Sequence, residues 1–383
     1  MAQFGIYIHW PFCESKCPYC DFNSHVSGIV DEVAWRDAYL AEINRYALET
    51  QNHVVTSVYF GGGTPSLMAA DTVAAVLQRI QSLWSVSNDF EVTAEANPSS
   101  SNGAQFEAFR KAGVNRLSLG MQSLSDESLV FLGRRHTSVE ARRAALEAAQ
   151  VFDRFSLDFI YALPGQTASA WRSELEQILA LAGGHLSLYQ LTIEPGTQFH
   201  KDRVPAAGEE AAEVLFRTTR NIMQATGLAD YEISNHALPG QECRHNLIYW
   251  RGEYYIGIGP GAHGRLPTHG LNTGLAIEAI QEIRMPNAWL MAVQSGEGGT
   301  QKRAALGWEE RFEELLLMGL RLTEGIEFRR FERLFGASLL TQLDKQKLER
   351  LVDRGFLELG EKTLAATAKG RQRLNAVLAA LIV

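Results

Sequence analysis

Cysteine is scarce in this chain, and long apolar runs are missing. Only four of the 383 residues are cysteine, and three of these, Cys13, Cys17 and Cys20, are close neighbours. A disulfide framework spreads its cysteines along the chain, so this clustering indicates ligands of a metal or a cluster instead. No apolar run approaches the roughly 20 residues of a membrane-spanning helix. The short apolar run 374–383 predicts a packed terminal helix.

The chain also lacks an excess of positive charge. Its formal net charge is −8, which argues against a large nucleic-acid surface, because such a surface needs a positive field. The first residues show no basic segment followed by an apolar run and a cleavage site, so no secretory signal is expected. We therefore expect a cytoplasmic protein with no nucleic-acid partner.

The first two thirds of the chain alternate short apolar runs with longer amphipathic ones. Strands separated by helices of this size predict right-handed βαβ units and a parallel sheet. Six units favour an α/β fold with a partial (β/α)6 TIM-like barrel, whose functional residues lie at the carboxyl ends of the strands. The expected strands are 4–9, 54–60, 90–95, 116–120, 156–161 and 186–193, and the expected helices are 33–49, 71–84, 104–112, 139–151, 168–181 and 209–226.

The composition of the sequence changes near Tyr231, after which aromatic residues, glycine and histidine become frequent. Further on, helical patterns return and a hairpin precedes a last helix, which predicts a C-terminal, mainly helical, winged-helix-like domain. We therefore expect three parts, namely a barrel (1–230), a connecting region (231–305) and a C-terminal domain (306–383). The C-terminal elements are expected at 311–321, 328–335, 339–354, 356–367 (the hairpin) and 371–381.

The cysteine loop reads Cys13-Glu-Ser-Lys-Cys17-Pro-Tyr-Cys20 and follows the first expected strand. A cubane cluster has four irons, so three thiolates leave one iron open. The amino and carboxylate groups of S-adenosylmethionine (SAM) could bind that iron. A reduced cluster could then pass an electron to the sulfonium and release a 5′-deoxyadenosyl radical. The spacing thus predicts a [4Fe–4S] cluster that binds SAM.

A structural zinc site is the alternative for this loop. Zinc usually takes four ligands, and His9 or His25 could supply the fourth. The remaining cysteine, Cys243, lies far away in sequence, and we expect it to be a free buried thiol.

Other motifs accompany the loop, and the combination is more specific than any one of them. Together with Tyr7-Ile-His-Trp-Pro-Phe-Cys13 and Cys20-Asp-Phe-Asn-Ser-His25, they resemble the HemN/HemW branch of the radical SAM superfamily over nearly the whole chain. That branch contains oxygen-independent coproporphyrinogen III oxidases and haem chaperones. The accompanying motifs are Gly61-Gly-Gly-Thr-Pro65, Glu95-Ala-Asn-Pro98, Leu119-Gly-Met-Gln-Ser123, Asp158-Phe-Ile-Tyr-Ala-Leu-Pro-Gly-Gln166 and Glu194-Pro-Gly-Thr197.

Three departures from the oxidase pattern favour the chaperones. The oxidases have a further cysteine where this chain has Phe22, and they carry an N-terminal extension that is not expected here. The segment His245-Asn-Leu-Ile-Tyr-Trp250 resembles a chaperone motif. The resemblance therefore implies a protein that binds haem and transfers it to haem-requiring apoproteins, including membrane-associated ones. An oxidase stays the alternative, and whether the protein is an enzyme stays open.

A third hypothesis is a radical SAM enzyme that acts on RNA through its C-terminal domain. One expected helix there carries positive charge, but acidic residues interrupt it, so a solvated face is the better account. The basic residues are Lys345, Lys347, Arg350 and Arg354, and the acidic ones are Glu349 and Asp353.

The resemblance also implies site residues, although it leaves catalytic residues unassigned. Family members can dimerise, so a homodimer is compatible with it. The SAM contacts implied are Tyr7, Tyr19, Gly62, Gly63, Thr64 and Glu95, and a second SAM or substrate pocket would include Gln122, Arg134 and Asp158. The candidates for haem are His245, Tyr249, Trp250, His263 and Cys243.

Overall fold

Six parallel strands lie side by side in the order in which the chain forms them. The computed structural model describes residues 3–268 and 276–382, and it confirms the predicted parallel sheet and partial barrel. The sheet is open, because among the described residues its two edge strands pair with no further strand. The six strands are β1 (Phe4–Trp10), β4 (Val54–Gly62), β5 (Ser85–Ala96), β6 (Arg116–Gln122), β7 (Phe155–Tyr161) and β8 (His185–Gln190).

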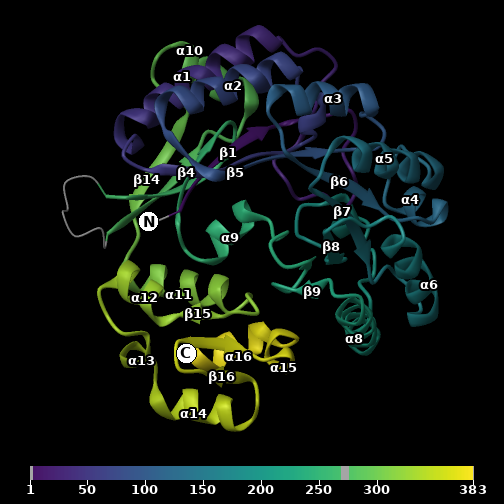
Figure 1. Cartoon of the computed structure of the whole chain (residues 1–383), viewed down its shortest axis with the longest axis vertical. Coiled ribbons are helices and arrows are strands. Elements are labelled where there is room, and N and C mark those ends of the chain that lie inside the picture. The colour runs from purple at the N-terminus through teal and green to yellow at the C-terminus, as the bar shows by residue number, and fades with distance from the viewer. Residues whose placement is uncertain (1–2, 269–275, 383) are drawn as a thin grey trace.

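Helices cover the convex side of this sheet (Figure 1). Each presents an apolar stripe to the strands, as α2 (Ala70–Leu83) does with Val73, Val76, Leu77 and Ile80, which have helical spacing and are buried. The other elements of this part are α1 (Glu32–Thr50), α3 (Gly103–Ala112), α4 (Asp126–Phe131), α5 (Ser138–Val151), α6 (Ala168–Leu179), α7 (Gln198–Lys201), α8 (Glu209–Ala225), the 3-10 turn η1 (Pro65–Leu67) and the short strands β2 (Phe12–Cys13), β3 (His25–Val26), β9 (Ala229–Asp230) and β10 (Asn235–Ala237).

The region after residue 231 extends the sheet, which the sequence did not predict. Strand β11 (Tyr254–Ile258) pairs in parallel with β1, and three antiparallel strands continue from it. Gly257 lets β11 pack closely, since a Cβ there would lie 2.3 Å from the His263 carbonyl oxygen. The sheet therefore has 12 strands among the described residues. The added elements are β12 (His263–Pro267), β13 (Ile277–Glu282), α10 (Pro286–Gln294) and β14 (Thr300–Ala305).

Helix α9 (Arg244–Trp250) lies on the concave side of the sheet, opposite the outer helices (Figure 1). Its Ile248 is fully buried, and its His245 forms a hydrogen bond with Ser57 of β4. The helix therefore fills part of the interior that a closed barrel would fill with strand side chains.

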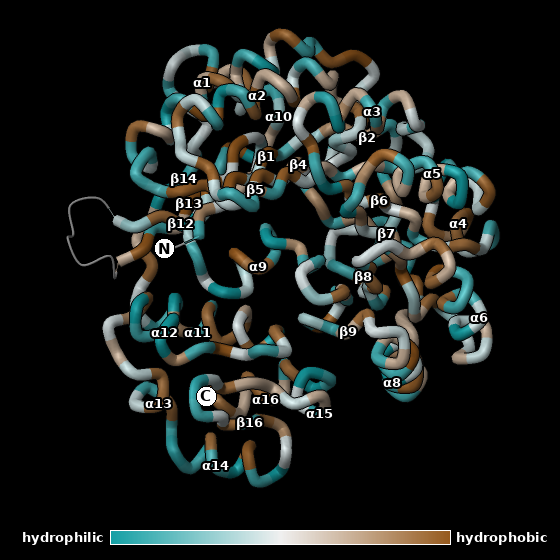
Figure 2. Tube along the Cα trace, in the orientation of Figure 1, coloured by the Kyte–Doolittle hydropathy of each residue, from teal (hydrophilic) through white to brown (hydrophobic). Residues whose placement is uncertain are grey.

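The C-terminal region has an apolar core of its own, and Figure 2 shows hydrophobic residues along its helix α16 (Leu374–Ile382). The expected terminal helix is therefore present, while Val383 lies outside the described residues. The expected helix 339–354 is two helices, because Asp344 accepts a hydrogen bond from the Lys347 backbone N–H and starts a new helix. The elements are α11 (Trp308–Gly319), β15 (Ile326–Glu327), α12 (Phe328–Phe335), α13 (Leu339–Gln342), α14 (Lys345–Asp353), β16 (Leu357–Leu359), β17 (Thr363–Ala366) and α15 (Ala368–Arg371).

The expected hairpin corresponds to β16 and β17, and β15 joins them in a small antiparallel sheet. Helices against such a sheet agree with the winged-helix-like expectation, while the three domain boundaries stay predictions. Within the described residues, no helix has both the length and the apolar character to cross a membrane.

Candidate cluster site and the cavity beside it

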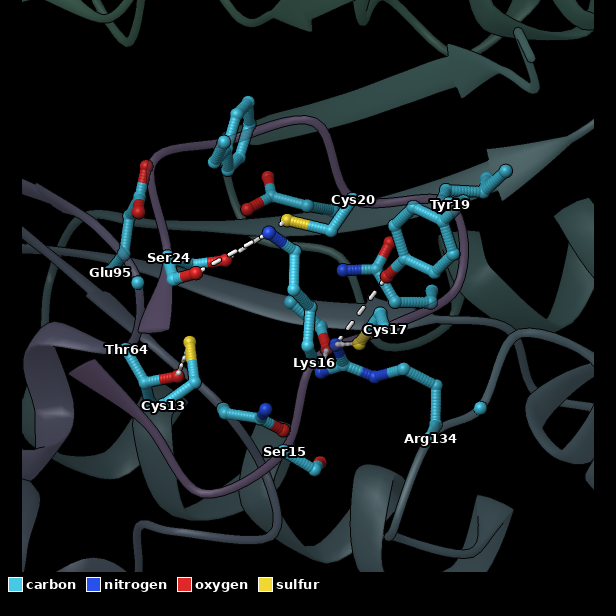
Figure 3. Close-up of a pocket in the computed structure, with 18 of the residues that line it drawn as sticks. Cys13, Ser15, Lys16, Cys17, Tyr19, Cys20, Ser24, Thr64, Glu95 and Arg134 are labelled. Carbon is cyan, nitrogen blue, oxygen red and sulfur yellow. Dashed lines mark hydrogen bonds between the residues drawn. The ribbon is translucent and has the colours of Figure 1, made fainter. Parts of the chain in front are cut away.

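The sequence motifs converge at the carboxyl ends of the parallel strands. Cys13, Cys17 and Cys20 line one cavity of about 360 Å³, and Figure 3 shows their thiols around a common space. This is the edge at which parallel α/β sheets bind their ligands. Most of the SAM and second-pocket residues implied by the resemblance line the same cavity, namely Tyr19, Gly62, Gly63, Thr64, Glu95, Gln122, Arg134 and Asp158.

Each of the three thiols has a different polar neighbour. Thr64 Oγ1 donates a hydrogen bond to Cys13 Sγ at 3.3 Å, and Cys20 Sγ lies 3.6 Å from Ser24 Oγ. Arg134 Nη1 donates to Cys17 Sγ at 3.4 Å. These partners come from separate segments of the chain, so they fix the positions of the three sulfur atoms relative to the strand ends.

The donor set fits a cubane cluster held by three thiolates. Burial raises the pKa of the Cys13 and Cys20 thiols, so iron must displace protons from them when it binds. The guanidinium of Arg134 lies beside Cys17, where its positive charge would compensate part of the negative charge of a bound cluster. Among the residues that the structure describes, no three His, Cys, Asp or Glu side chains gather around a point where a single metal ion would sit.

The glycines of the Gly61–Pro65 motif serve the packing of the cysteine loop. Gly62 has a φ of +114°, and a Cβ on it would lie 2.5 Å from the His9 ring. A Cβ on Gly63 would lie 2.6 Å from the Phe12 carbonyl oxygen. Only glycine therefore lets this loop press against the start of the cysteine loop, and the contact brings Thr64 to Cys13.

Glu95 is a half-buried residue at the end of β5. The Tyr59 hydroxyl donates to Glu95 Oε1 at 2.9 Å, and the Gly62 backbone N–H donates to Oε2 at 3.2 Å. Burial raises the pKa of Glu95 to about 7, with a further contribution from Asp158. The carboxyl can therefore change charge near neutral pH, close to where a cationic ligand would bind.

The second-pocket candidates also lie at strand ends. Gln122, at the end of β6, has a φ of +67°, a strained value for a residue other than glycine. Asp158 accepts hydrogen bonds from Ser118 and Ser156 at 2.7 and 2.8 Å, and burial raises its pKa. Gln122 and Asp158 thus line the cavity from neighbouring strands.

Two SAM candidates have contacts that the motifs did not indicate. The Tyr19 hydroxyl accepts a hydrogen bond from Arg134 at 3.4 Å, so Tyr19 is held by the residue that contacts Cys17. Tyr7 does not line the cysteine cavity; its hydroxyl lies 3.0 Å from His9 Nδ1 on the wall of a second cavity. Its position on β1, before the strand end, accounts for the difference.

The second cavity has a volume of about 440 Å³ and a mainly apolar wall. It lies between the inner side of β1, β11 and β12, helix α9 and the C-terminal helices, and it shares Phe22, Gly62 and Glu95 with the first cavity. The sequence motifs did not indicate its C-terminal wall, whose only signal was the apolar face of two helices. That wall consists of Arg311, Glu314, Leu315, Met318, Leu334 and Phe335.

The haem candidates are distributed unevenly around this cavity. Tyr249, Trp250 and His263 line it, whereas His245 and Cys243 do not. His245 is buried, and its two ring nitrogens bond to Ser57 Oγ at 2.8 Å and to the Tyr249 hydroxyl at 2.7 Å. Burial lowers the pKa of His245 to about 3, so the ring is neutral.

Cys243 is buried as expected, with its thiol 3.7 Å from Glu91 Oε1. Burial raises the pKa of this thiol to about 12. Neither Cys243 nor His245 therefore lines the second cavity.

Comparison with known families gives two matches along the chain. The family described as the radical SAM superfamily matches residues 7–178, which include part of β1, the cysteine loop and the next four parallel strands, β4 to β7. The family described as the HemN C-terminal domain matches residues 308–373, which cover most of the small second core.

Individual relatives are similar over most or all of the chain as well. The mitochondrial radical S-adenosyl methionine domain-containing protein 1 of Danio rerio is 37% identical over 388 residues, which cover 100% of this chain and 87% of the relative. The heme chaperone HemW of Haemophilus influenzae is 32% identical over 386 residues, covering 99% and 97%. The heme chaperone HemW of Escherichia coli K12 is 40% identical over 268 residues, covering 70% and 71%.

Among solved structures, coproporphyrinogen III oxidase (HemN) from Escherichia coli, described as a radical SAM enzyme, has a similar fold. The TM-score is 0.80 at 19% sequence identity, and the match covers 99% of this chain and 90% of that one. At this level of identity the similarity concerns the fold alone, including the open sheet and the C-terminal helices.

Proposed function

Because the chain belongs to the HemN/HemW branch of the radical SAM superfamily, we propose that it is a haem chaperone that binds haem and transfers it to haem-requiring apoproteins. Relatives 32–40% identical to it carry the name heme chaperone. The proposal includes a [4Fe–4S] cluster and SAM in the cysteine cavity. It further includes a cytoplasmic location, although the relative from Danio rerio is named mitochondrial.

The observation that carries the proposal is the second cavity. It is apolar, it measures about 440 Å³, and it opens beside the cysteine cavity rather than within it. Pockets for small molecules and cofactors are concave, mainly apolar and of this general size. Tyr249, Trp250 and Tyr255 supply flat aromatic side chains that suit a planar macrocycle.

In this proposal the cysteine cavity holds the resident cofactors. Cys13, Cys17 and Cys20 would ligate three irons, and the bound cluster with SAM supplies the capacity for one-electron chemistry. Thr64, Ser24 and Arg134 orient the thiols. Glu95 lies on the wall between the cavities, so the protonation state of its carboxyl group can change when a ligand binds on either side.

Haem titration followed by transfer tests the proposal. The cluster-loaded protein should bind haemin saturably and should then pass it to an apo-haemoprotein faster than free haemin reconstitutes that acceptor under matched conditions. Absorption spectra of the acceptor report the transfer. Absence of saturable binding, or of transfer, would contradict the chaperone function.

The same preparation distinguishes the alternative enzyme. Incubated anaerobically with coproporphyrinogen III, SAM and a reductant, a chaperone should form no protoporphyrinogen. Sustained formation of protoporphyrinogen would establish the oxidase instead. The proposal also includes membrane-associated clients, which transfer to acceptor apoproteins in membrane vesicles would test. It includes a homodimer as well, which light scattering of the haem-free and haem-loaded protein would test.

A further inference from the structure

We propose that His263 provides the iron ligand for haem in the second cavity, and that His245 only positions the aromatic wall. This inference rests on the proposed haem function and adds the site and the ligand. Three histidines come into question, since His9 and His263 line the cavity and His245 lies behind it. An imidazole must offer a nitrogen lone pair to bind iron.

The hydrogen bonds of His9 and His245 occupy both nitrogens of each ring. His9 Nδ1 lies 3.0 Å from the Tyr7 hydroxyl, and His9 Nε2 lies 2.9 Å from the Asn23 carbonyl oxygen. Because a carbonyl only accepts, His9 Nε2 carries the proton and Nδ1 accepts from Tyr7. His245 is likewise bonded at both nitrogens, between Ser57 and Tyr249. Either ring would have to break a hydrogen bond that is at least partly buried before it bound a metal.

His263 differs from both. Its ring lines the second cavity and is exposed, and it forms no hydrogen bond with any residue that the structure describes. Burial of part of the ring and the neighbouring Arg265 lower the pKa of His263, which keeps the imidazole in its neutral, metal-binding form. Its nitrogens can therefore bind a ligand at no cost in internal hydrogen bonds.

The geometry of β12 directs His263 toward the cavity. Side chains alternate along a strand, and the cavity-lining residues His263 and Arg265 are separated by Gly264, while Leu266 is buried in the core. Tyr255 lies opposite Arg265 on the neighbouring strand and lines the cavity too. Two adjacent strands thus present one ligand and one aromatic ring to the same space.

The other walls suit a flat, apolar molecule. The rings of Tyr249 and Tyr255 lie 4.6 Å apart and almost perpendicular, while Met318 and Phe335 face them from the C-terminal helices. Glu95, Glu253, Glu314, Arg265 and Arg311 supply the charged groups of the lining. Arg265 is paired with Glu314 at 3.1 Å, so the two charges largely compensate each other.

The role left for His245 is positional. Its ring connects Ser57 of β4 to the Tyr249 hydroxyl, so it fixes the ring of Tyr249 in the cavity wall. Loss of His245 should therefore weaken haem binding without changing the atom that ligates iron. Loss of His263 should change both.

Haemin titration of the full-length, cluster-loaded protein separates these roles. The wild type should give a Soret band of a histidine-ligated haem. His263→Ala should weaken binding at least ten-fold and shift that band, and added imidazole should restore it by replacing the missing ligand. His245→Ala should weaken binding while it keeps the wild-type band. His200→Ala removes an exposed histidine that lines neither cavity, so it should match the wild type.

The outcomes distinguish the inference from the function on which it rests. If the wild type binds no haemin saturably, the haem function fails and the inference fails with it. If the wild type binds but His263→Ala keeps its affinity and band, only the inference is overturned. A band shift in His245→Ala alone would assign the ligand to His245. Iron and sulfide content, measured for every variant, shows that a change in haem binding does not follow from a lost cluster.

Discussion

The two cavities share a wall but are assembled in different ways. The first collects residues from loops at the ends of successive parallel strands, so most of its candidate ligand contacts belong to short motifs such as Cys13–Cys20 or Gly61–Pro65. The second joins Tyr7, Tyr249 and Phe335, which lie on separate elements far apart in the chain. A site built from motif loops can therefore be recognised in the sequence, because its residues stand in short, regular patterns. A site between two cores draws on dispersed apolar residues, which form no such pattern.

The largest expected effect concerns the first cavity alone. Cys17→Ala should reduce bound iron from about four atoms per chain to almost none after reconstitution, because a cluster needs its three thiolates. Iron and sulfide analysis measures this. Haemin affinity should stay within a few-fold of the wild type, since Cys17 does not line the second cavity.

Cys243→Ala is the matched control for that experiment. Its thiol is buried away from both cavities, so this variant should retain iron and sulfide. Equal iron in Cys17→Ala and the wild type, or stoichiometric zinc without sulfide, would refute the cluster assignment.

The next effect concerns the helix behind the second cavity. His245→Ala deletes one buried and one partly buried hydrogen bond and leaves a cavity, which should lower the free energy of unfolding by about 3 kcal/mol. Chemical denaturation measures the change, and the exposed His200→Ala should stay within about 0.5 kcal/mol of the wild type. An unaltered denaturation midpoint in His245→Ala would show that α9 does not depend on this residue.

The stability of the protein should depend on pH through Glu95, which lies on the wall between the cavities. Burial holds the pKa of Glu95 at about 7, above its ordinary value of 4.5. The folded state therefore keeps this proton more tightly than the unfolded chain does. The resulting contribution to stability is complete below pH 4.5 and is lost as the pH rises through 7, a change on the order of 3 kcal/mol.

Glu95→Gln should remove that pH dependence, because an amide does not titrate. Between about pH 4.5 and 8, the free energy of unfolding of the cofactor-free wild type should fall by about 3 kcal/mol more than that of Glu95→Gln, because other buried groups contribute equally to both curves. Glu213→Gln on the exposed face of α8 serves as control. Parallel curves for the wild type and Glu95→Gln would contradict a protonated buried carboxyl group.

The smallest effect compares two neighbours on α11. Met318 lines the second cavity, whereas Leu317 is 48% exposed and does not. Met318→Glu places a charge in the apolar wall and should weaken haemin binding about ten-fold, equivalent to about 1.4 kcal/mol. Leu317→Glu should leave haemin affinity unchanged. Equal affinities in the two variants would place haem elsewhere.

Much of the barrel could be predicted because its signals are local. Apolar runs of strand length and helices with a clear buried stripe gave the six parallel strands in their correct order. Strand β11 was missed because five residues that include Gly257 form too short a pattern, and their partner β1 lies about 250 residues earlier. The split at Asp344 was missed because helical periodicity continues through it, although a cap residue was there to be recognised.

The cysteine cavity was likewise predictable, and the second cavity was only partly so. The motif ending in Tyr249 and Trp250 indicated a site, and both residues line it. The motif did not reveal that His245 faces Ser57, since that depends on how α9 packs against β4. Sequence patterns identify residues that matter more readily than they reveal which atom contacts a ligand.

The pairing of β1 with β11 has a consequence for biosynthesis. β1 lies inside the sheet between β4 and β11, yet β11 leaves the ribosome about 250 residues later. At typical synthesis rates of about 5–20 residues per second, one edge of β1 stays without its partner for roughly 12 to 50 s. An open edge of this kind can pair with other chains. The nascent protein is therefore most prone to aggregate before the residues of β11 emerge.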